Sequence, residues 1–244
     1  MLILLPPSEG KTAPAAGDPL DLTALSSPRL HRTREQLLNA LVRVSGTRRG
    51  AEVLGLGPAQ AEDLARNTRL RDEPTAAAIE VYTGVLYGEL DWASLSGTAR
   101  ARGAEQVAIA SALFGIVRPD DQIPAYRLSG GVSLPRLGTV TSRWRPVLPR
   151  AINELAGGDL VVDLRSGVYV NHGPVDAVTI RVLTETDGRR TVVSHHNKAT
   201  KGRIVREVLS EGVDADDAAG FATALRDLGW TVDHTAHHHL DVLT

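Results

Sequence analysis

Continuous apolar stretches predict several short buried strands. Met1–Leu5, Gln106–Ala110 and Asp159–Leu164 are almost wholly apolar and have the length of strands that are buried on both faces. The stretches 175–184 and 191–195 flank Asp187-Gly188, which is typical of a β-hairpin turn. A last strand is expected to begin near Val232.

Apolar residues spaced three and four apart predict helices between these strands. We expect a first helix from Ser27 to about Val44, with Ser27 as its N-cap and Pro28 in its first turn. Further helices are expected over 52–70 (as two short helices), 74–85, 144–155, 201–209 and 216–228. The strands and helices do not follow a strict βαβ rhythm. The sequence therefore predicts a single α/β (α+β) domain, residues 1–244, with a mixed β-sheet flanked by helices.

The composition excludes several classes of protein. With 42% hydrophobic and 23% charged residues, the chain of 244 residues has ordinary globular values. It has no run of about 18 apolar residues, so we expect no membrane span, and Met1–Leu5 is too short for a signal peptide. We therefore expect a cytoplasmic protein. The absence of cysteine excludes disulfides, thiol nucleophiles, iron–sulfur clusters and Cys-ligated zinc.

The positive charges narrow the search for a site. The net charge is −2, so an anion-binding site must be a local patch. Only three lysines are present, Lys11, Lys198 and Lys201, and a GC-rich genome that favours Arg codons would explain this. Each of them nevertheless lies beside Gly, Ser, Thr or Asn, and the compact ammonium suits phosphate contact and pKa tuning. The lysines are therefore candidates for one shared anion site.

The segment after the first strand, Ser8-Glu9-Gly10-Lys11-Thr12, is similar to the end of a phosphate-binding P-loop. A P-loop needs glycine where Leu5 stands, and Pro6 and Pro7 remove two N–H donors. We therefore do not predict a P-loop NTPase. The alternatives are a loop that presents Ser8 and Lys11 to an anion, or an exposed turn.

A Pro-bounded loop over 111–128 places Arg118, Tyr126 and Arg127 after a strand. Loops at strand ends commonly build sites, and Arg suits bidentate capture of phosphate or carboxylate. The alternative is a buried Arg–Asp brace that orders a long connection.

Two later segments add polar residues at further strand ends. Asp163 ends an apolar run, where an unpaired carboxylate would be costly, so we expect Lys198 or Arg118 as its partner. Ser166 and Tyr169 follow it. In 194–203, basic residues gather at a helix start, where they oppose the helix dipole unless an anion is bound. These basic residues are Lys198, Lys201 and Arg203.

Residues 53–62 match the hairpin of a helix-hairpin-helix element, an element expected over about 46–70. Gly55 and Gly57 would allow close approach to a DNA phosphate, and the N–H groups near Ala59 would face it. The alternative is an ordinary packing corner between two helices.

Near the C-terminus, four histidines lack a metal-ligand spacing, so we expect a solvated tail, no metal site and no cofactor; these are His234, His237, His238 and His239.

Five segments, in this order, resemble the YaaA family of cytoplasmic peroxide-stress proteins: MLILLPPSEGKT, VYTGVLYGEL, SALFGIVRPDDQIPAYRL, VVDLRSGVY and SHHNKATKGRIVREVL. The resemblance covers nearly the whole chain. It implies one α/β domain with a positively charged cleft and a helix-hairpin-helix element. It also implies DNA binding and protection from hydrogen peroxide through lower available iron and less oxidative DNA damage.

Residue by residue, the resemblance places the hairpin at Gly55 and Gly57. It places the cleft at Lys11, Arg118, Tyr126, Arg127, Ser166, Tyr169, Lys198 and Lys201. Two features depart from the family's pattern: the tandem basic pair is Lys198-Ala199 here, and the hairpin lacks lysine.

Two functions compete on this basis. The first is a stress protein that contacts DNA phosphates through Gly55, Gly57, Ala59 and the basic cleft. The second is an enzyme acting on a nucleotide-like or other anionic small molecule. In the second, the catalytic candidates are Lys198, Asp163, Tyr126 and Ser166, with Asp163 orienting Lys198. The anion contacts would come from Ser8, Lys11, Arg118, Arg127, Tyr169, Lys201 and Arg203.

A third hypothesis, direct iron handling, has less support because no facial-triad spacing is visible. We expect a monomer without a membrane partner.

Overall fold

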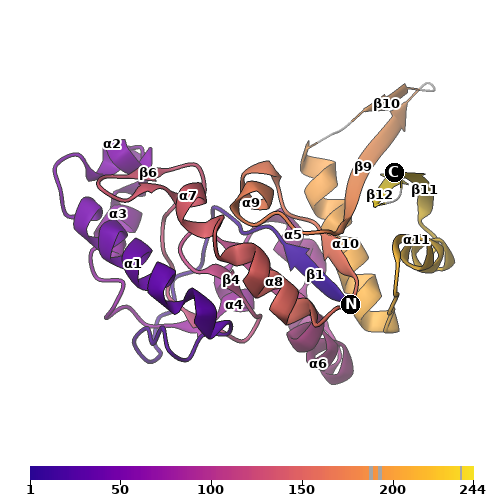
Figure 1. Cartoon of the computed structure of the whole chain (residues 1–244), viewed down its shortest axis with the longest axis horizontal. Helices are drawn as coiled ribbons and strands as arrows, with labels where there is room; N and C mark the ends of the chain where they lie inside the picture. Colours follow the sequence, from indigo (N-terminus) through magenta and orange to yellow (C-terminus); the bar gives the residue numbers. More distant parts are fainter. Residues whose placement is uncertain (187–188, 192–193, 237) are drawn as a thin grey trace.

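The computed structural model describes residues 1–186, 189–191, 194–236 and 238–244. Within these residues, eight strands form one mixed sheet in the order β11-β12-β9-β8-β1-β3-β4, and β10 pairs with β9 (Figure 1). The strands of this sheet are β1 (Leu2–Leu5), β3 (Val107–Ser111), β4 (Gly115–Val117), β8 (Val161–Asp163), β9 (Val178–Thr186), β10 (Arg189–Thr191), β11 (Thr231–Ala236) and β12 (His239–Leu243).

Two short antiparallel pairs lie outside the sheet, β2 (Ala76–Ala77) with β5 (Gln122–Ile123) and β6 (Ser133–Leu134) with β7 (Gly138–Thr139). The helices are α1 (His31–Ser45), α2 (Gly50–Leu54), α3 (Ala61–Asn67), α4 (Ala78–Val81), α5 (Val85–Leu90), α6 (Gly97–Gln106), α7 (Val140–Trp144), α8 (Leu148–Ala156), α9 (Gly167–His172), α10 (Ser194–Glu211) and α11 (Ala218–Asp227). Short 3-10 turns occur at Pro28–Leu30, Pro58–Gln60 and Trp92–Ser94. The predicted α/β class with a mixed sheet is confirmed.

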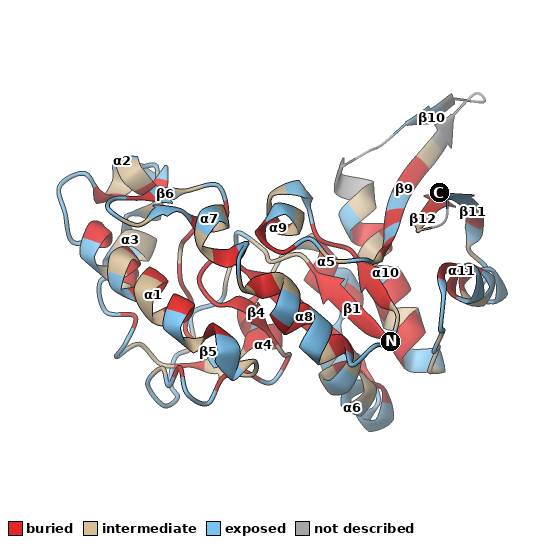
Figure 2. Ribbon diagram, viewed as in Figure 1, coloured by how far each residue is buried: buried red, intermediate tan, exposed pale blue. Residues whose placement is uncertain are grey.

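Strand β1 lies in the interior of the sheet, between β8 and β3, and its sequence is apolar at every position. It is buried throughout and pairs in parallel with β3 on one side and β8 on the other (Figure 2). Leu4 is level with Ala108 of β3 and with Asp163 of β8. The carboxyl ends of the three strands therefore meet at one edge of the sheet, where loops from distant parts of the chain come together.

Several predicted elements differ from the observed ones for local reasons. The helix expected over 74–85 is divided into β2, α4 and α5, because Gly84 adopts φ 107°, a conformation that interrupts a helix. The helix expected over 144–155 is two helices, α7 and α8, on either side of Pro146. Ser27 makes no side-chain cap, and Pro28 opens a 3-10 turn before α1.

At the C-terminal side, α10 begins at Ser194, seven residues before the predicted start. The strand expected over 191–195 is therefore wrong from Ser194 onward, and residues 192–193 lie outside the described residues. The expected hairpin partner is β10, which pairs antiparallel with β9, and the turn at Asp187-Gly188 also lies outside the described residues. The histidine-rich end is not an irregular tail, since His234 lies in β11 and His239 in β12, but His234 is exposed as expected; His237 is outside the described residues.

Candidate functional site

A cleft of about 730 Å³ opens at the edge of the sheet where β1 and β8 end. Four stretches of chain line it: residues 6–10 after β1, 83–87 at the start of α5, 164–169 after β8, and 197–201 on α10. Loops that follow neighbouring parallel strands form binding sites in many open α/β sheets. The fold thus brings together polar segments that are widely separated in the sequence.

Two ammonium groups and one hydroxyl among the lining residues are of the kind that can bind an anion. Lys198 and Lys201 lie one turn apart on α10, and both line the cleft. Lys198 is exposed, whereas burial lowers the pKa of Lys201, an effect that the negative charge of Asp163 partly opposes. The exposed Ser166 precedes α9 and lines the cleft, and its hydroxyl caps no helix N–H.

Among the described residues that line the cleft, Glu9 carries the only carboxylate. Arg127 makes two contacts with Glu9. One guanidinium nitrogen lies 3.0 Å from a carboxylate oxygen, and another donates to the backbone carbonyl of Glu9 at 3.0 Å. Ser129 donates to the same carboxylate at 3.1 Å. Arg127 therefore anchors Glu9 from the side instead of presenting a free guanidinium to the cleft.

Lys11 lies behind the cleft wall, on the rings of two tyrosines. Its ammonium is 4.3 Å from the ring centre of Tyr126 and 5.3 Å from that of Tyr82, and it donates to the Ser8 carbonyl at 2.9 Å. Burial lowers the pKa of Lys11 to about 8, although Glu9 nearby acts in the opposite direction. Lys11 therefore supports residues 8–10 of the cleft wall rather than lining the cleft itself.

The phenol of Tyr126 belongs to a buried chain of hydroxyl groups. It lies 3.0 Å from the Tyr82 hydroxyl and 2.8 Å from the Ser111 hydroxyl, which accepts the Phe114 N–H. Burial raises the pKa of Tyr126 well above its usual value. Tyr126 thus lies beneath the cleft, while Tyr87 and Tyr169 line it. The four tyrosines of the chain form one cluster beside the cleft.

We expected Asp163 to orient Lys198, but this prediction is wrong, because the partner of Asp163 is Arg165. The fully buried guanidinium contacts both carboxylate oxygens, at 2.9 and 2.7 Å, and also donates to the carbonyls of Tyr169 and Gly173. This pair satisfies the carboxylate at the end of β8 locally. It also fixes the 164–169 loop, which carries Ser166 into the cleft.

Arg118 and Arg203 do not line the cleft. Arg118 donates to the carbonyls of Glu105 and Val107, at the amino end of β3, and is therefore at the opposite end of that strand from the cleft. Arg203 lies half-exposed on α10, 3.8 Å from the carboxylate of Glu89. Ser8 does line the cleft, but its hydroxyl donates to the Gly10 carbonyl and accepts the Thr83 N–H.

The predicted DNA-contact residues lie in a separate corner between α2 and α3. Gly55 has the left-handed φ of 67° at the end of α2, and the N–H of Gly57 donates to the Gln60 side chain at 2.9 Å. Arg49 pairs with Glu52, and Arg66 pairs with Glu62 and Asp63. Ala59 lies in the 3-10 turn that follows Gly57. No contact described here tests the helix-hairpin-helix assignment, which stays a prediction.

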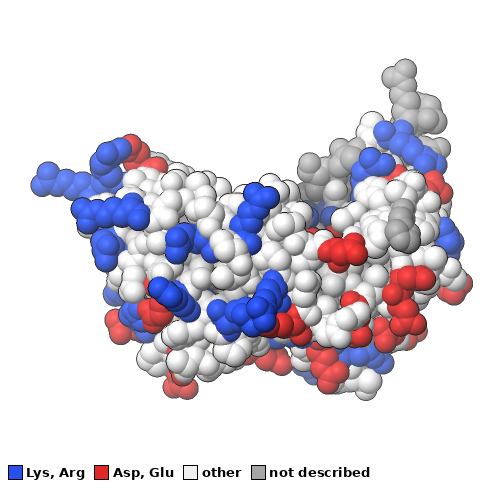
Figure 3. Space-filling model, viewed as in Figure 1, with Lys and Arg blue, Asp and Glu red and all other residues white. Residues whose placement is uncertain are grey.

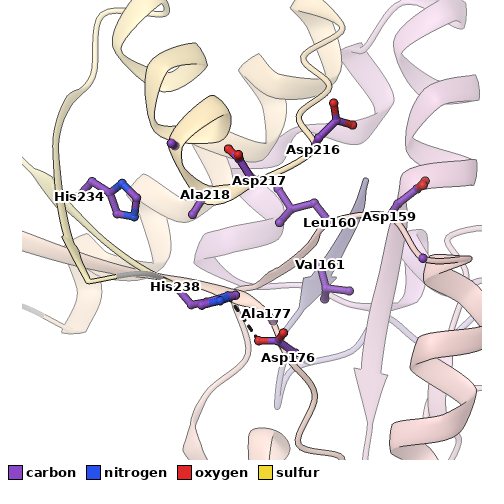
Figure 4. A pocket seen from close by; sticks show the side chains of 12 residues that line it. Asp159, Leu160, Val161, Asp176, Ala177, Asp216, Asp217, Ala218, His234 and His238 are labelled. Carbon is purple, nitrogen blue, oxygen red and sulfur yellow. Dashed lines mark ion pairs between the residues drawn. The ribbon is translucent and has the colours of Figure 1, made fainter.

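A second pocket, of about 300 Å³, lies at the amino ends of β8 and β9 and has a different character (Figure 4). It is rich in carboxylates, and His238 contacts Asp176 at 3.4 Å. Across the described parts of the chain, no group of three or more His, Asp or Glu side chains is arranged to hold a metal ion. The acidic lining makes this pocket a poor match for an anion.

Sequence reasoning missed several polar residues of the cleft, namely Glu9, Thr83, Tyr87, Arg165 and Asn197. Glu9 stands between Ser8 and Lys11 in the motif that we singled out, so its position was a usable signal. Nothing in the local sequence distinguishes Asn197, which reaches the cleft only because α10 begins at Ser194.

Comparisons with known proteins show which family this chain belongs to. The family model described as "Peroxide stress protein YaaA" matches residues 1–235. The UPF0246 protein SCO2297 of Streptomyces coelicolor is 45% identical over 242 residues, covering 97% of this chain and 93% of that protein. The UPF0246 protein CE1889 of Corynebacterium efficiens is 44% identical over 240 residues, covering 96% and 95% respectively.

None of the helices in the described ranges has both the length and the apolar character needed to cross a membrane. The match to the family model extends over all four stretches that line the cleft. The chain belongs to the YaaA family of peroxide stress proteins.

Proposed function

We propose that the cleft binds an anionic small molecule of the phosphate-ester type and is the active site of an enzyme. One observation carries this proposal: Lys198, Lys201 and Ser166 come from two separate segments and line one concave cleft. Concave sites with a few converging polar groups are the usual form of small-molecule sites. Ammonium groups act on phosphate as point charges.

The residues in and around the cleft then have distinct roles in binding and catalysis. The exposed Lys198 and the exposed Ser166 hydroxyl meet the incoming anion, and the partly buried Lys201 contacts it deeper in the cleft. Glu9 is the carboxylate best placed to accept a proton from a bound hydroxyl or water, and Arg127 and Ser129 hold it in place. Tyr126, Lys11 and Asp163 act as positioning residues, because their contacts are to the cleft walls.

The test is calorimetric titration with inorganic phosphate, pyrophosphate, AMP and ATP. Lys198→Ala should weaken binding of the best ligand by about 10-fold or more, equivalent to about 1.4 kcal/mol. Arg203→Ala is the matched control, because it removes a positive charge from the same helix outside the cleft. The proposal fails if none of the four anions binds at low salt, or if both variants weaken binding equally.

A second candidate function is contact with the DNA backbone at the corner that holds Gly55, Gly57 and Ala59. The family's description as peroxide stress proteins supports this candidate, in which a cytoplasmic protein limits iron-dependent damage to DNA. The ion pairs of Arg49 and Arg66 reduce the positive charge available there. Affinity for a duplex should fall steeply between about 50 and 200 mM salt if phosphates are contacted. Absence of binding at the lower salt would eliminate this candidate.

A further inference from the structure

An apolar groove ringed by arginines lies at the far end of the molecule from the acidic pocket. Its volume is about 630 Å³, and it is formed by the end of α1, the 46–49 loop, α2 and the turn between β6 and β7. It shares no lining residue with the cleft. A function of this groove is therefore independent of anion binding in the cleft, although the groove shares the 46–49 loop and α2 with the corner considered for DNA contact.

The floor of the groove is apolar, and its rim is cationic. Ala40, Val44, Val53 and Pro135 supply apolar surface, and the arginines around them are Arg43, Arg48, Arg49 and Arg136. Figure 3 shows Lys and Arg side chains gathered at the end of the molecule that carries α1 and α2, while acidic side chains are more frequent on the other half. This arrangement is notable in a chain whose net charge is −2.

Three of the four arginines have no acidic partner within the described part of the chain. Arg49 is the exception, since its guanidinium contacts both carboxylate oxygens of Glu52, at 3.0 and 2.7 Å. Arg43, Arg48 and Arg136 are exposed and form no ion pair among the described residues. Arg136 also stands at φ 65°, a conformation that a residue with a side chain rarely adopts. The groove thus presents positive charge that no described residue of this chain neutralises.

We propose that this groove binds an acidic amphipathic segment of a partner protein. An amphipathic helix places apolar side chains on one face, which matches the apolar floor, and carboxylates beside that face would meet Arg43, Arg48 and Arg136. Charge complementarity across such a surface gives specificity and a faster association rate. A DNA backbone offers phosphates but no apolar stripe, so the apolar floor favours a peptide.

The probe is a fluorescent synthetic helix of about 14 residues, with Leu on one face and Glu on the other. Two further ligands are compared with it: the same peptide with every Leu replaced by Ser, and a labelled DNA duplex. Fluorescence anisotropy should show the Leu/Glu peptide binding at least about 10-fold more tightly than either. A duplex that binds as tightly as the peptide, equal affinity for the two peptides, or no peptide binding at low salt would each overturn the proposal.

The arginines provide an internal control. Combining R43A, R48A and R136A should weaken peptide binding by about 10-fold or more, whereas R49A should weaken it only about twofold because Glu52 already neutralises Arg49. All four side chains are exposed, so the variants should fold, and circular dichroism of each variant is the check on this. An R49A effect equal to that of the triple variant would contradict the assigned roles. Phosphate or nucleotide binding in the cleft should remain unchanged in the triple variant.

Discussion

At the scale of single residues, Lys11 shows how burial sets the behaviour of a charge. The folded protein holds its ammonium against two aromatic rings, and its pKa falls from 10.5 to about 8. The folded protein therefore releases this proton at a lower pH than the unfolded chain does. Between these two values the unfolded chain binds more protons, so the contribution of Lys11 to stability rises with pH.

This reasoning gives a pH-dependent prediction for K11M. Below about pH 8 the wild-type protein carries the full cost of the buried charge, and the variant does not. The stability of the variant relative to wild type should therefore be highest near pH 7 and should decline steadily towards pH 10. Thermal unfolding at several pH values measures this difference, and K198M controls for loss of an exposed lysine. A difference that is constant with pH would refute the argument.

Arg34 is a second buried cation, and it stabilises a turn. Its guanidinium is fully buried and donates to the carbonyls of Phe114 and Ile116, at 2.9 and 2.8 Å, so it connects α1 to the turn between β3 and β4. Burial lowers the pKa of Arg34 to about 10.

Replacing Arg34 by Met should therefore lower the free energy of unfolding by about 2–4 kcal/mol, because two buried carbonyls lose their donors. Urea denaturation measures the loss. R32M is the matched control, since the neighbouring Arg32 is exposed, and it should change the free energy by less than about 0.5 kcal/mol. Equal stability of the two variants would show that the Arg34 contacts contribute little.

At the scale of elements, the packing of α10 on α5 determines the width of the cleft. The two helices form two walls of the cleft: Lys198 and Lys201 lie on α10, and Leu86 and Tyr87 lie on α5. They approach closely at Gly202, where a methyl group would lie 2.3 Å from the Leu86 carbonyl oxygen. Glycine is therefore required here by the contact between the two helices.

The variant G202A should lower the free energy of unfolding by about 1–3 kcal/mol through overpacking, and it should weaken anion binding in the cleft. The control is G88A on α5, an exposed helical position with open space around it. Alanine there should stabilise the protein by about 0.5–1 kcal/mol. Chemical denaturation and calorimetry provide the two readings, and a neutral G202A would exclude a close contact at this position.

The elements also show what the sequence can and cannot predict. The buried strands β1, β3 and β8 could be predicted directly from their apolar runs. A strand that is covered on both faces has apolar residues at nearly every position, and this pattern is visible in the sequence. The helix expected over 74–85 is divided because backbone freedom at Gly84 outweighs apolar periodicity. Arg118 was misplaced because β4 runs antiparallel to β3 and returns the chain to the amino end of that strand. The local pattern gives no sign of that reversal.

At the scale of the whole molecule, the cleft depends on parts of the chain nearly 200 residues apart. The polar segments at 6–10, 164–169 and 197–201 could be singled out from the sequence because each follows a strand or begins a helix. The contacts that individual residues of these segments make could not be predicted from the sequence. Asp163 has a partner two residues away, whereas Lys198 or Arg118 was expected, since sequence alone cannot rank a local partner against a remote one.

A bound anion should therefore protect distant parts of the chain together. With saturating pyrophosphate, hydrogen–deuterium exchange should slow in the stretches 6–10, 83–87, 164–169 and 197–201 at once, and remain unchanged in β11 and β12. K198A at the same ligand concentration should show much less protection. Protection confined to the region of α1 and α2 would instead place the anion in the arginine-rimmed groove.

The clustering of the four tyrosines has a practical consequence for spectroscopy. A label that replaces every tyrosine, such as fluorotyrosine, normally reports on a protein as a whole. In this chain all four labelled rings would lie in or directly beneath the cleft. A ¹⁹F spectrum of the uniformly labelled protein would then contain four resonances that all report on one small region, and ligand binding could be followed there without any engineered site.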